Sequence, residues 1–236
     1  MTSTTAAAPD GVRPAPPAAV LFDLDGVIID SWQATLLALA AVVTAQLGQV
    51  VAATAFEPFV TEPPPDVFEA FGVPSARQVY DDEYDPAFLA ALPAVAVFEP
   101  VVAGIRELAA AGVGVGVVTR QSERRAHLLI PPELADCALV LIAHEQAEPK
   151  PAPDGLLLAL DRLGVPPGRA LFVGDTRTDV VAARAAGVRC VLVEWGFTPA
   201  AELAGYGADA VLTAPSAIGV GLLRLLDGES LTVVHG

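Results

Sequence analysis

Two carboxylates that directly follow an apolar run are the residues of this chain best placed to do chemistry. Ala19–Phe22 is a short apolar run, typical of a strand buried on both faces, and Asp23, Asp25 and Gly26 come straight after it. Because alternate residues of a strand share a face, Asp23 and Asp25 are expected on one side, and Gly26 allows a sharp turn. Two like charges this close need a cation or a proton between them. On this stretch alone, a solvated acidic turn explains the residues equally well.

The composition sets limits on the class of protein. The 236 residues are 53% hydrophobic, which is typical of a globular protein, and their number suggests one large domain or a domain with a modest insertion. A net charge of −15 argues against nucleic acid as a partner, because phosphate backbones are bound by basic surfaces. The two cysteines, Cys137 and Cys190, lie far apart without metal-ligand spacing, so we expect free thiols in a reducing cytoplasm.

The sequence predicts neither an export signal nor a membrane-spanning segment. Residues 1–17 are rich in Ala, Thr and Pro and have no basic segment followed by an apolar core, so they are predicted to be a disordered leader. The longest apolar stretch, residues 35–47, is too short to span a bilayer. Residues 229–236 form a tail of unassigned role. We predict a cytoplasmic protein.

Residues 32–96 are predicted to form a small helical module inserted into the main domain. Ser31 is a plausible N-cap for an Ala- and Leu-rich helix that runs to Leu47 and ends at Gly48. Prolines then cluster at residues 63–65, and short helical pieces at 66–71 and 86–91 alternate with turns. Strand signals are weak throughout this segment.

The rest of the chain, residues 18–31 and 97–228, is predicted to be the core domain. From residue 100 onward, helical and apolar-strand patterns alternate, which predicts an α/β fold with a parallel sheet covered on both faces. Helices are expected over 101–111, 122–130, 153–163, 178–186 and 216–226, and strands over 113–118, 138–143, 170–173, 188–193 and 209–212.

Polar residues follow several of these strands, where ligands bind in such sheets. They are Thr119, Lys150, Asp175 and Asp179, in addition to the first acidic pair. Each alone has an ordinary explanation: a helix N-cap for Thr119, a solvated charge for Lys150 and helix-start acids for Asp175 and Asp179. Together, at successive strand ends, they predict one site.

Lys150 strengthens this prediction. It is the only lysine in a chain whose 13 basic residues are otherwise arginine, and a compact ammonium is not replaced by a planar guanidinium. Several carboxylates at close range stay ionised around a hard cation, and oxygen ligands suit Mg²⁺. A carboxylate nucleophile beside Mg²⁺, with Lys and Thr donors, is typical of phosphoryl transfer.

These motifs resemble the haloacid dehalogenase superfamily, and most closely its phosphoglycolate-phosphatase-like branch. The match covers residues 18–213 and comprises Asp23-Leu-Asp-Gly-Val, Thr119, Lys150-Pro-Ala-Pro-Asp154 and Gly174-Asp175-Thr-Arg-Thr-Asp179. The resemblance implies a Rossmann-like core with an inserted helical cap of the C1 type. It implies a Mg²⁺-dependent phosphomonoesterase that acts through an aspartyl-phosphate.

The resemblance also implies a role for each matched residue. Asp23 would be the nucleophile, and Asp25 would protonate the leaving group and later activate water. Thr119 and Lys150 would hold the phosphoryl group. Asp175 would bind Mg²⁺ together with Asp23 and the backbone carbonyl of Asp25. Asp179 completes the predicted metal site, in direct support of the ligands or through water.

Some members of the superfamily are disfavoured by particular residues. Dehalogenases lack an acid at the position of Asp25, and phosphonate-cleaving members need a cap lysine that is absent here. Arg120 stands where the family usually has a small polar residue, so it is predicted to contact substrate or to pair with an acid. Thr119, Arg120 and Lys150 are therefore the predicted substrate-binding residues.

The cap is strongly acidic, with eight acids against one base, Arg77. If these acids face the active site, they disfavour substrates with several anionic groups, which suggests a monophosphate with a neutral or cationic leaving group. The alternative is that they coat the outer surface. The acids are Glu57, Glu62, Asp66, Glu69, Asp81, Asp82, Glu83 and Asp85.

Other functions and residues remain open at this point. A sugar-phosphate phosphomutase would use the same intermediate, and a phospho-acceptor or silent binding module is a third possibility. The expected partner is a small phosphorylated metabolite, and the protein is expected to be a monomer or homodimer. Arg124 and Arg125 are interpreted as an exposed helix pair, and His144 as a residue without a clustered partner.

Overall fold

A seven-stranded sheet forms the centre of the molecule in the computed structural model, which describes residues 16–229 and 233–234. The strand order is β5-β4-β1-β6-β7-β8-β9, and every neighbouring pair is parallel. The strands are β1 Ala19–Phe22, β4 Gly114–Val118, β5 Val140–Ile142, β6 Ala170–Gly174, β7 Arg189–Val193, β8 Ala210–Leu212 and β9 Val233–Val234. The predicted α/β fold with a parallel sheet is confirmed.

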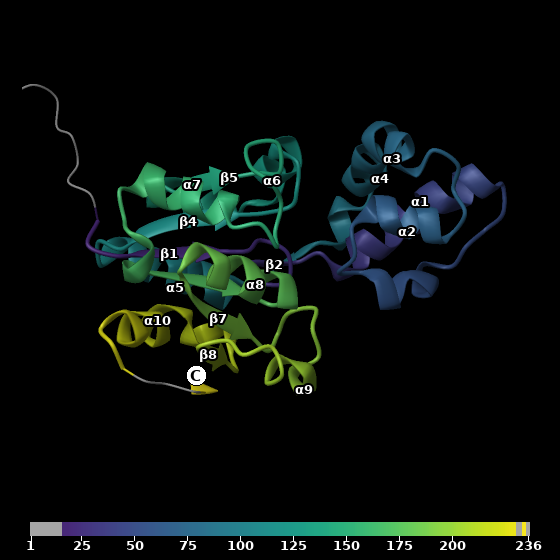
Figure 1. Ribbon diagram of the computed structural model, residues 1–236. Helices are drawn as coiled ribbons and strands as arrows, with labels where there is room; N and C mark the ends of the chain where they lie inside the picture. Colours follow the sequence, from purple (N-terminus) through teal and green to yellow (C-terminus); the bar gives the residue numbers. More distant parts are fainter. Residues whose placement is uncertain (1–15, 230–232, 235–236) are drawn as a thin grey trace, which may run out of the picture.

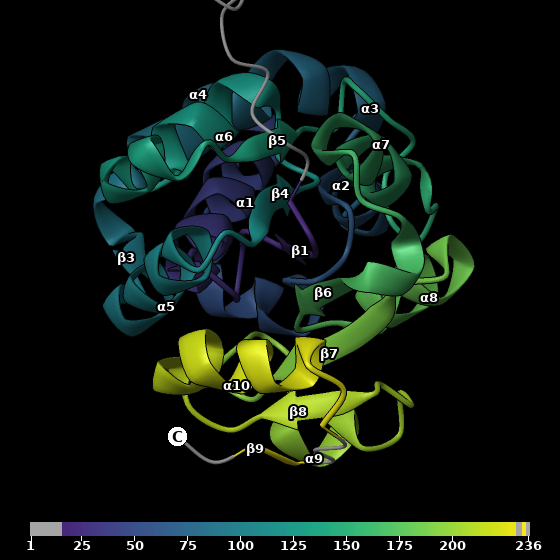
Figure 2. The same ribbon diagram turned by 90° about the vertical axis from the view of Figure 1, so that its left-hand side faces the viewer.

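Helices cover both faces of this sheet (Figures 1 and 2). On one face lie α5 Glu99–Ala110, α6 Glu123–Leu129 and α10 Ile218–Leu226, and on the other α7 Asp154–Leu163 and α8 Arg177–Ala186. A short helix, α9 Ala200–Leu203, follows β7. The residues of β1 are completely buried, because the strand lies between β4 and β6 and is covered from both sides. A continuous apolar run is the sequence expected for such a strand.

The segment between β1 and α5 is helical and lies at one end of the core (Figure 1). We refer to residues 32–96 as the cap; the division into separate domains remains a prediction. Its helices are α1 Trp32–Leu47, α2 Pro64–Ala70, α3 Ala76–Val79 and α4 Asp85–Ala90, with a π-helical turn over Tyr80–Tyr84 and 3₁₀ turns over Ala53–Phe59 and Leu92–Ala94. Three fully buried phenylalanines, Phe56, Phe68 and Phe88, pack in its interior.

Two very short strands connect the cap to the core. β2 Ile29–Asp30 pairs antiparallel with β3 Ala96–Val97, so the chain enters and leaves the cap side by side. Sequence analysis did not predict this ribbon, because two residues are too few to show an alternating pattern. The ribbon sets where the cap lies relative to the end of β1.

Ser31 does not have the role that its position predicted. It precedes α1, but its side chain makes no capping hydrogen bond, and the carboxylate of Asp30 accepts from the backbone N–H of Trp32 at 3.0 Å instead. The hydroxyl of Ser31 is turned to the carboxylate of Asp25. Ser31 therefore occupies the predicted N-cap position, but its side chain does not cap the helix.

The remaining general predictions have mixed outcomes. Cys190 is buried and Cys137 half-buried, and neither forms a disulfide within the described chain. Within residues 16–229 and 233–234, no helix has the length and apolar character needed to cross a bilayer. Residues 1–15 of the predicted leader and most of the predicted tail lie outside the described residues, and the cytoplasmic location stays a prediction.

Candidate active site

The carboxyl ends of three adjacent strands bring the predicted residues together. Asp23 follows β1, Thr119 follows β4 and Asp175 follows β6. The backbone turns sharply after β1 because Gly26 has a φ of +75°, and a Cβ at this position would lie 2.9 Å from Cγ of Asp175. Only glycine therefore allows the first acidic loop to lie against the loop that follows β6.

A buried lysine joins two of the carboxylates. Nζ of Lys150 lies 2.8 Å from Oδ2 of Asp23 and 2.6 Å from Oδ1 of Asp179. All three residues are buried, with exposed fractions of at most 8%. The backbone N–H of Leu24 donates to Oδ1 of Asp23 at 2.8 Å, which fixes the second carboxylate oxygen. Hydrogen bonds to ionised groups in a dry site are short and strong, so this geometry is well defined.

Asp179 also organises the loop that carries Asp175. Its Oδ2 accepts hydrogen bonds from the backbone N–H of Asp175 at 3.2 Å and of Thr176 at 2.9 Å, and from the Thr176 hydroxyl at 2.6 Å. This arrangement is a capping box at the start of α8. Both oxygens of Asp179 are thus occupied by protein donors, which makes it a support for Lys150 and the Asp175 loop.

Burial shifts the pKa values of these groups in different directions. Desolvation raises the pKa of Asp23 to about 6, although the charge of Lys150 opposes the shift. Desolvation, followed by the negative charges of Asp179 and Asp23, raises the pKa of Asp175 well above its ordinary value. Desolvation would also raise the pKa of Asp179, but Lys150 and the Thr176 hydrogen bonds outweigh it and lower that pKa.

This cluster contains three carboxylates and one ammonium group, so its acidic groups outnumber its basic group. Oxygen atoms of Asp23, Asp175 and Asp179 all lie within 4.8 Å of one another. Lys150 is the only base in direct contact with them among the described residues, and its own pKa is raised because Asp179 and Asp23 outweigh desolvation. A buried oxygen-rich cluster with excess negative charge suits a hard divalent cation. The donor set therefore fits Mg²⁺.

The carboxylate of Asp25 does not join this cluster. Nε2 of Gln121 donates to its two oxygens at 3.0 and 2.9 Å, and the hydroxyl of Ser31 donates to Oδ1. Of the predicted metal residues, Asp23, Asp175 and Asp179 are thus brought together by their side chains, whereas Asp25 is held beside them by two other residues. Sequence analysis missed Gln121 and Ser31, since no local pattern links Gln121 to an acid 96 positions away.

Thr119 and Arg120 lie at the end of β4. Oγ1 of Thr119 accepts from the backbone N–H of Gln121 at 3.1 Å, and the residue is 5% exposed. Nη2 of Arg120 donates to the carbonyl of Thr61 in the cap at 3.0 Å. Arg120 therefore contacts the cap rather than an acid.

A cavity of about 210 Å³ separates the cap from these strand ends. The core contributes the acidic and phosphate-binding candidates, and the cap contributes the loop at residues 60–65 together with Thr35, Arg77, Tyr80 and Tyr84. Four cations line it, namely Arg77, Arg120, Arg125 and Lys150. The predicted residues Asp23, Asp25, Arg120, Lys150 and Asp175 all contribute to one cavity. Thr119 and Asp179 are buried and do not form part of its wall.

Two interpretations from the sequence are corrected by this cavity. Arg125 is only 2% exposed and lines the cavity, whereas sequence analysis interpreted it as an exposed surface residue. His144 also lines the cavity, and its Nδ1 lies 3.1 Å from Oε2 of the adjacent Glu145, so it does have an acidic partner. The burial of Arg125 depends on tertiary packing that a helix pattern does not show.

Comparison with known proteins decides the family. The family model described as haloacid dehalogenase-like hydrolase matches residues 20–193, which includes every motif at the strand ends. The chain belongs to the haloacid dehalogenase-like hydrolases. The resemblance recognised from the motifs is therefore confirmed, and the chain is an enzyme of this hydrolase family.

Relatives within the family are described as acting on different phosphates. A phosphoglycolate phosphatase of Xanthomonas campestris is 34% identical over 188 residues, covering 77% of this chain and 85% of the relative. A protein of Caldanaerobacter subterraneus named "Putative pyrophosphatase PpaX" is also 34% identical, over 191 residues, covering 77% of this chain and 83% of its own. This haloacid dehalogenase-like hydrolase is thus similar to phosphatases of small molecules.

Solved structures agree with the fold. A hydrolase of Deinococcus radiodurans, determined with bound phosphate and sodium, has a TM-score of 0.67 at 26% identity and covers 93% of this chain and 100% of its own. A structure from Clostridium acetobutylicum, described as a predicted phosphatase, has a TM-score of 0.75 at 22% identity, covering 88% of this chain and 98% of its own. The latter identity supports the fold alone.

Proposed function

We propose that this enzyme is a Mg²⁺-dependent phosphomonoester hydrolase in which Asp23 accepts the phosphoryl group. The observation that carries the proposal is the buried cluster of Asp23, Asp175 and Asp179 around Lys150, which opens into a cavity of about 210 Å³. The 34% identical phosphoglycolate phosphatase supports the same reaction class. Asp23 and Asp175, with the backbone carbonyl of Asp25, would hold Mg²⁺, which supplies charge neutralisation for the carboxylates and the phosphoryl oxygens.

Neighbouring donors fix the orientation of the Asp23 carboxylate, the proposed nucleophile. Lys150 and the N–H of Leu24 each bind one oxygen of Asp23, so the carboxylate cannot rotate freely. Lys150 also places a positive charge beside the transferring phosphoryl group, and the hydroxyl of Thr119 is the proposed second donor. Fixed donors that stabilise the charge of the transition state are the main source of catalysis in phosphoryl transfer.

Asp25 is the proposed acid and base. Its carboxylate lines the same cavity as Asp23, two residues away, and Gln121 and Ser31 fix its orientation. In the first step it gives a proton to the leaving-group oxygen, and in the second it takes a proton from the water that attacks the phosphorylated Asp23. The two acids thus have separate roles because their hydrogen-bond partners differ.

The cavity favours a small monophosphate that carries a further anionic group. Seven of the eight cap acids lie outside the cavity wall, and only Glu62 contributes to it. The expectation that the acidic cap selects a neutral or cationic leaving group is therefore unsupported, because its premise is wrong. The cavity wall contains four cations beside four acids, and the volume of the cavity suits a compact metabolite. The cations are Arg77, Arg120, Arg125 and Lys150, and the acids are Asp23, Asp25, Glu62 and Asp175. A substrate of the phosphoglycolate kind, with a phosphate and a carboxylate, satisfies these features.

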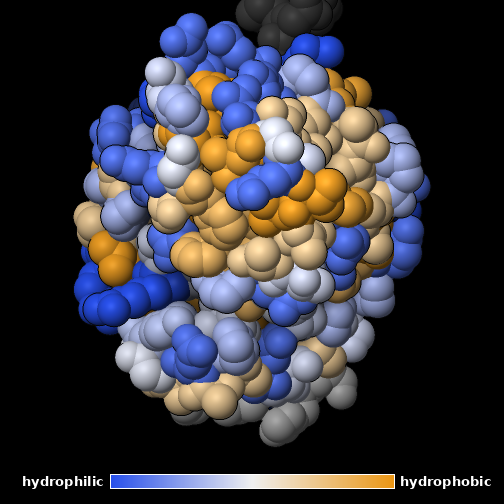
Figure 3. All heavy atoms as spheres, turned by 90° about the vertical axis from the view of Figure 1, so that its right-hand side faces the viewer, coloured by the Kyte–Doolittle hydropathy of each residue, from blue (hydrophilic) through white to orange (hydrophobic). Residues whose placement is uncertain are grey.

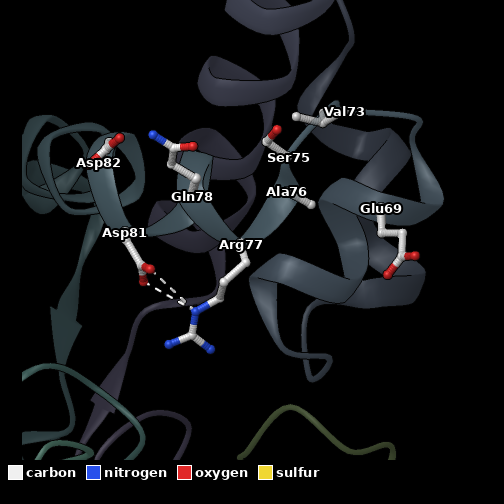
Figure 4. Close-up of a pocket in the computed structure, with 8 residues that line it drawn as sticks. All are labelled: Glu69, Val73, Ser75, Ala76, Arg77, Gln78, Asp81 and Asp82. Carbon is white, nitrogen blue, oxygen red and sulfur yellow. Dashed lines mark hydrogen bonds and ion pairs between the residues drawn. The ribbon is translucent and has the colours of Figure 1, made fainter.

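Most acids of the cap lie on its outer surface. Figure 4 shows the residues around a second pocket, formed by α2, α3 and the π-helical turn, where Arg77 pairs with Asp81 at 3.3 Å. Figure 3, which looks onto the cap end of the molecule, shows apolar residues gathered in one area with polar residues around them. Six of the eight cap acids are exposed, and the other two, Glu83 and Asp85, are half-buried.

Hydrolysis assays test the proposal directly. We expect an aryl phosphate and 2-phosphoglycolate to be hydrolysed with Mg²⁺, and turnover to be lost with EDTA or in Asp23→Asn. Asp161→Asn, an exposed acid on α7, is the matched control and is expected to retain full activity. Turnover that survives in Asp23→Asn would contradict the proposed nucleophile.

A substrate panel tests the proposed specificity. We expect 2-phosphoglycolate to exceed pyrophosphate and glucose bisphosphate in kcat/KM, because the cavity is small and holds one phosphoryl site. A strong preference for pyrophosphate would contradict a monophosphate substrate. Transfer of a phosphoryl group between positions of one sugar, without net release of phosphate, would identify a phosphomutase instead.

A further inference from the structure

Arg125 is a buried cation whose contacts with polar and aromatic side chains cross from the core to the cap. It lies on α6 of the core, and its side chain is 2% exposed. Its Nη1 is 3.0 Å from Oδ1 of Asp85, and its Nη2 donates to the hydroxyl of Tyr80 at 3.3 Å. Within the described residues its Nε has no hydrogen-bond partner. Because a buried charge is stabilised by its few partners, the loss of one of them is strongly destabilising.

Aromatic rings of the cap enclose the same guanidinium. Its central carbon lies 5.0 Å from the ring centre of Tyr84 and 5.6 Å from that of Phe88. Both distances are in the range of cation–π attraction, which strengthens when the cation is desolvated. Tyr80 and Tyr84 are themselves stacked, with centres 5.4 Å apart. The cap therefore presents a preformed pocket for one arginine.

A local irregularity of the cap builds this pocket. Residues Tyr80–Tyr84 form a π-helical turn between α3 and α4, and such turns are rare and often occur at functional sites. The turn supplies Tyr80 and Tyr84, and α4, which begins at Asp85, supplies the carboxylate. Ser122, the N-cap residue of α6, donates from its hydroxyl to Oδ2 of Asp85 at 3.2 Å, so both oxygens of Asp85 contact the core.

The burial of Arg125 depends on the position of the cap. If the cap moves away from the core, Arg125 and Asp85 separate and both gain water. When the cap lies on the core, Asp85 is the only acid that pairs with the buried Arg125 among the described residues, whereas Asp85 itself keeps 31% of its side chain exposed. Loss of one partner then destabilises the closed arrangement specifically, because it leaves an uncompensated charge at the interface.

We propose that Arg125 is a positioning residue that fixes the cap over the catalytic cavity through Asp85 and the Tyr80, Tyr84 and Phe88 rings. The inference rests on the proposed phosphatase function, since Arg125 lines the cavity in which the reaction would occur. It acts through the placement of the cap wall and not on the reacting atoms. Arg120 contributes a second, weaker contact across the interface through the carbonyl of Thr61.

Paired substitutions test the role of Arg125. Asp85→Asn leaves Arg125 without its anion, and we expect kcat/KM for 2-phosphoglycolate to fall roughly 30-fold, equivalent to about 2 kcal/mol. Arg125→Met keeps the apolar length and should cost about 10-fold, because Asp85 is partly exposed and tolerates the loss better. The double variant should lose about 30-fold rather than the 300-fold product, since both changes remove one interaction. Arg124→Met, the exposed neighbour, is the matched control.

A spectroscopic measurement separates cap placement from general damage. Trp32 of α1 packs edge-on against Phe197 of the core, with ring centres 5.4 Å apart. The chain has two tryptophans, so in a Trp195→Phe background the fluorescence reports on Trp32 alone. We expect acrylamide to quench Trp32 about 2-fold more efficiently in Asp85→Asn than in the background protein, because an open cap exposes the indole.

The outcomes decide the inference independently of the function. Losses in kcat/KM that multiply in the double variant, or an activity loss with unchanged Trp32 quenching, would overturn the positioning role. Non-additive losses together with increased quenching support it. If Asp23→Asn retains full turnover, the proposed function fails, whereas the quenching comparison still decides whether Arg125 holds the cap.

Discussion

The charge excess in the active-site cluster predicts how pH affects the stability of the metal-free protein. The pKa of Asp23 rises from 3.8 to about 6 on folding, so the folded state binds this proton more tightly than the unfolded state. A group with a raised pKa stabilises the fold fully below its unfolded pKa, and the contribution is lost as pH rises through the folded pKa. The metal-free protein should therefore become less stable between pH 4 and pH 7 on account of Asp23.

The magnitude follows from the shift. About 2 pKa units correspond to about 3 kcal/mol at low pH, of which less than half remains at pH 5 and almost none at pH 8. A loss of about 1 kcal/mol lowers the Tm of a chain of this size by about 2–4 °C. The raised pKa of Asp175 acts in the same direction. Mg²⁺ at about 100 times its Kd should restore about 2.7 kcal/mol at pH 8.

Thermal unfolding in EDTA and in Mg²⁺, at pH 5 and pH 8, measures these quantities. Other acids and histidines also titrate, so the informative comparison is between the wild type and Asp23→Asn, with Asp161→Asn as the exposed control. We expect the fall in stability from pH 5 to pH 8 to be about 1 kcal/mol smaller in Asp23→Asn. An equal fall in all three proteins, or a metal-free protein that gains stability at pH 8 through Asp23, would contradict this expectation.

Three further predictions concern single side chains. Lys150→Met should lower kcat about 10³-fold, because it removes a fixed donor to the phosphoryl group, and Lys150→Arg should not restore it; steady-state kinetics with retained far-UV circular dichroism checks this. Gly196→Ala should lower Mg²⁺ affinity at least roughly 10-fold, because the added Cβ would lie 2.6 Å from Oδ2 of Asp175. Calorimetric titration with Mg²⁺ measures this affinity, and an unchanged value would contradict the geometry. Gln121→Leu should slow hydrolysis of an alkyl phosphate about 10-fold but spare an activated aryl phosphate, because Asp25 matters most for a poor leaving group; equal losses on both would argue against the role of Gln121.

The sequence was sufficient for the features that depend on local patterns. A fully apolar run identified β1 as a central strand, and the acids that follow it were correctly placed at the sheet edge. Parallel topology then brought Thr119, Lys150 and Asp175 to the same edge without any knowledge of side-chain geometry. These inferences succeeded because strand ends in such folds converge by construction.

The features that were missed depend on contacts between distant segments. Arg125 is one of two adjacent arginines on a short helix, a pattern typical of a solvated face, and its partners lie 37 or more positions earlier in the cap. The charge balance of the cap was misleading for a related reason. Composition counts acids without showing which way they face, and seven of eight lie outside the cavity wall. Whether an acidic side chain faces a cavity depends on the tertiary structure.

Asp25 was predicted from the sequence as a functional acid, but its hydrogen-bond partners were not. Its type and spacing after β1 marked it as a functional acid, yet nothing in the sequence indicated that Gln121 and Ser31 hold its carboxylate apart from the cluster around Asp23. That separation is consistent with the different roles that we propose for the two acids. It arises because β4 ends beside β1 in the sheet and because the chain turns back after Gly26.

Trapping the covalent intermediate tests whether Asp23 is the nucleophile. The enzyme would be mixed with excess 2-phosphoglycolate and Mg²⁺, quenched in acid within one turnover, digested and analysed by mass spectrometry. We expect one phosphoryl group on the peptide that contains Asp23, and none in Asp23→Asn. A phosphoryl group on another residue, or product formed at full rate with no phosphorylated peptide, would contradict nucleophilic attack by Asp23.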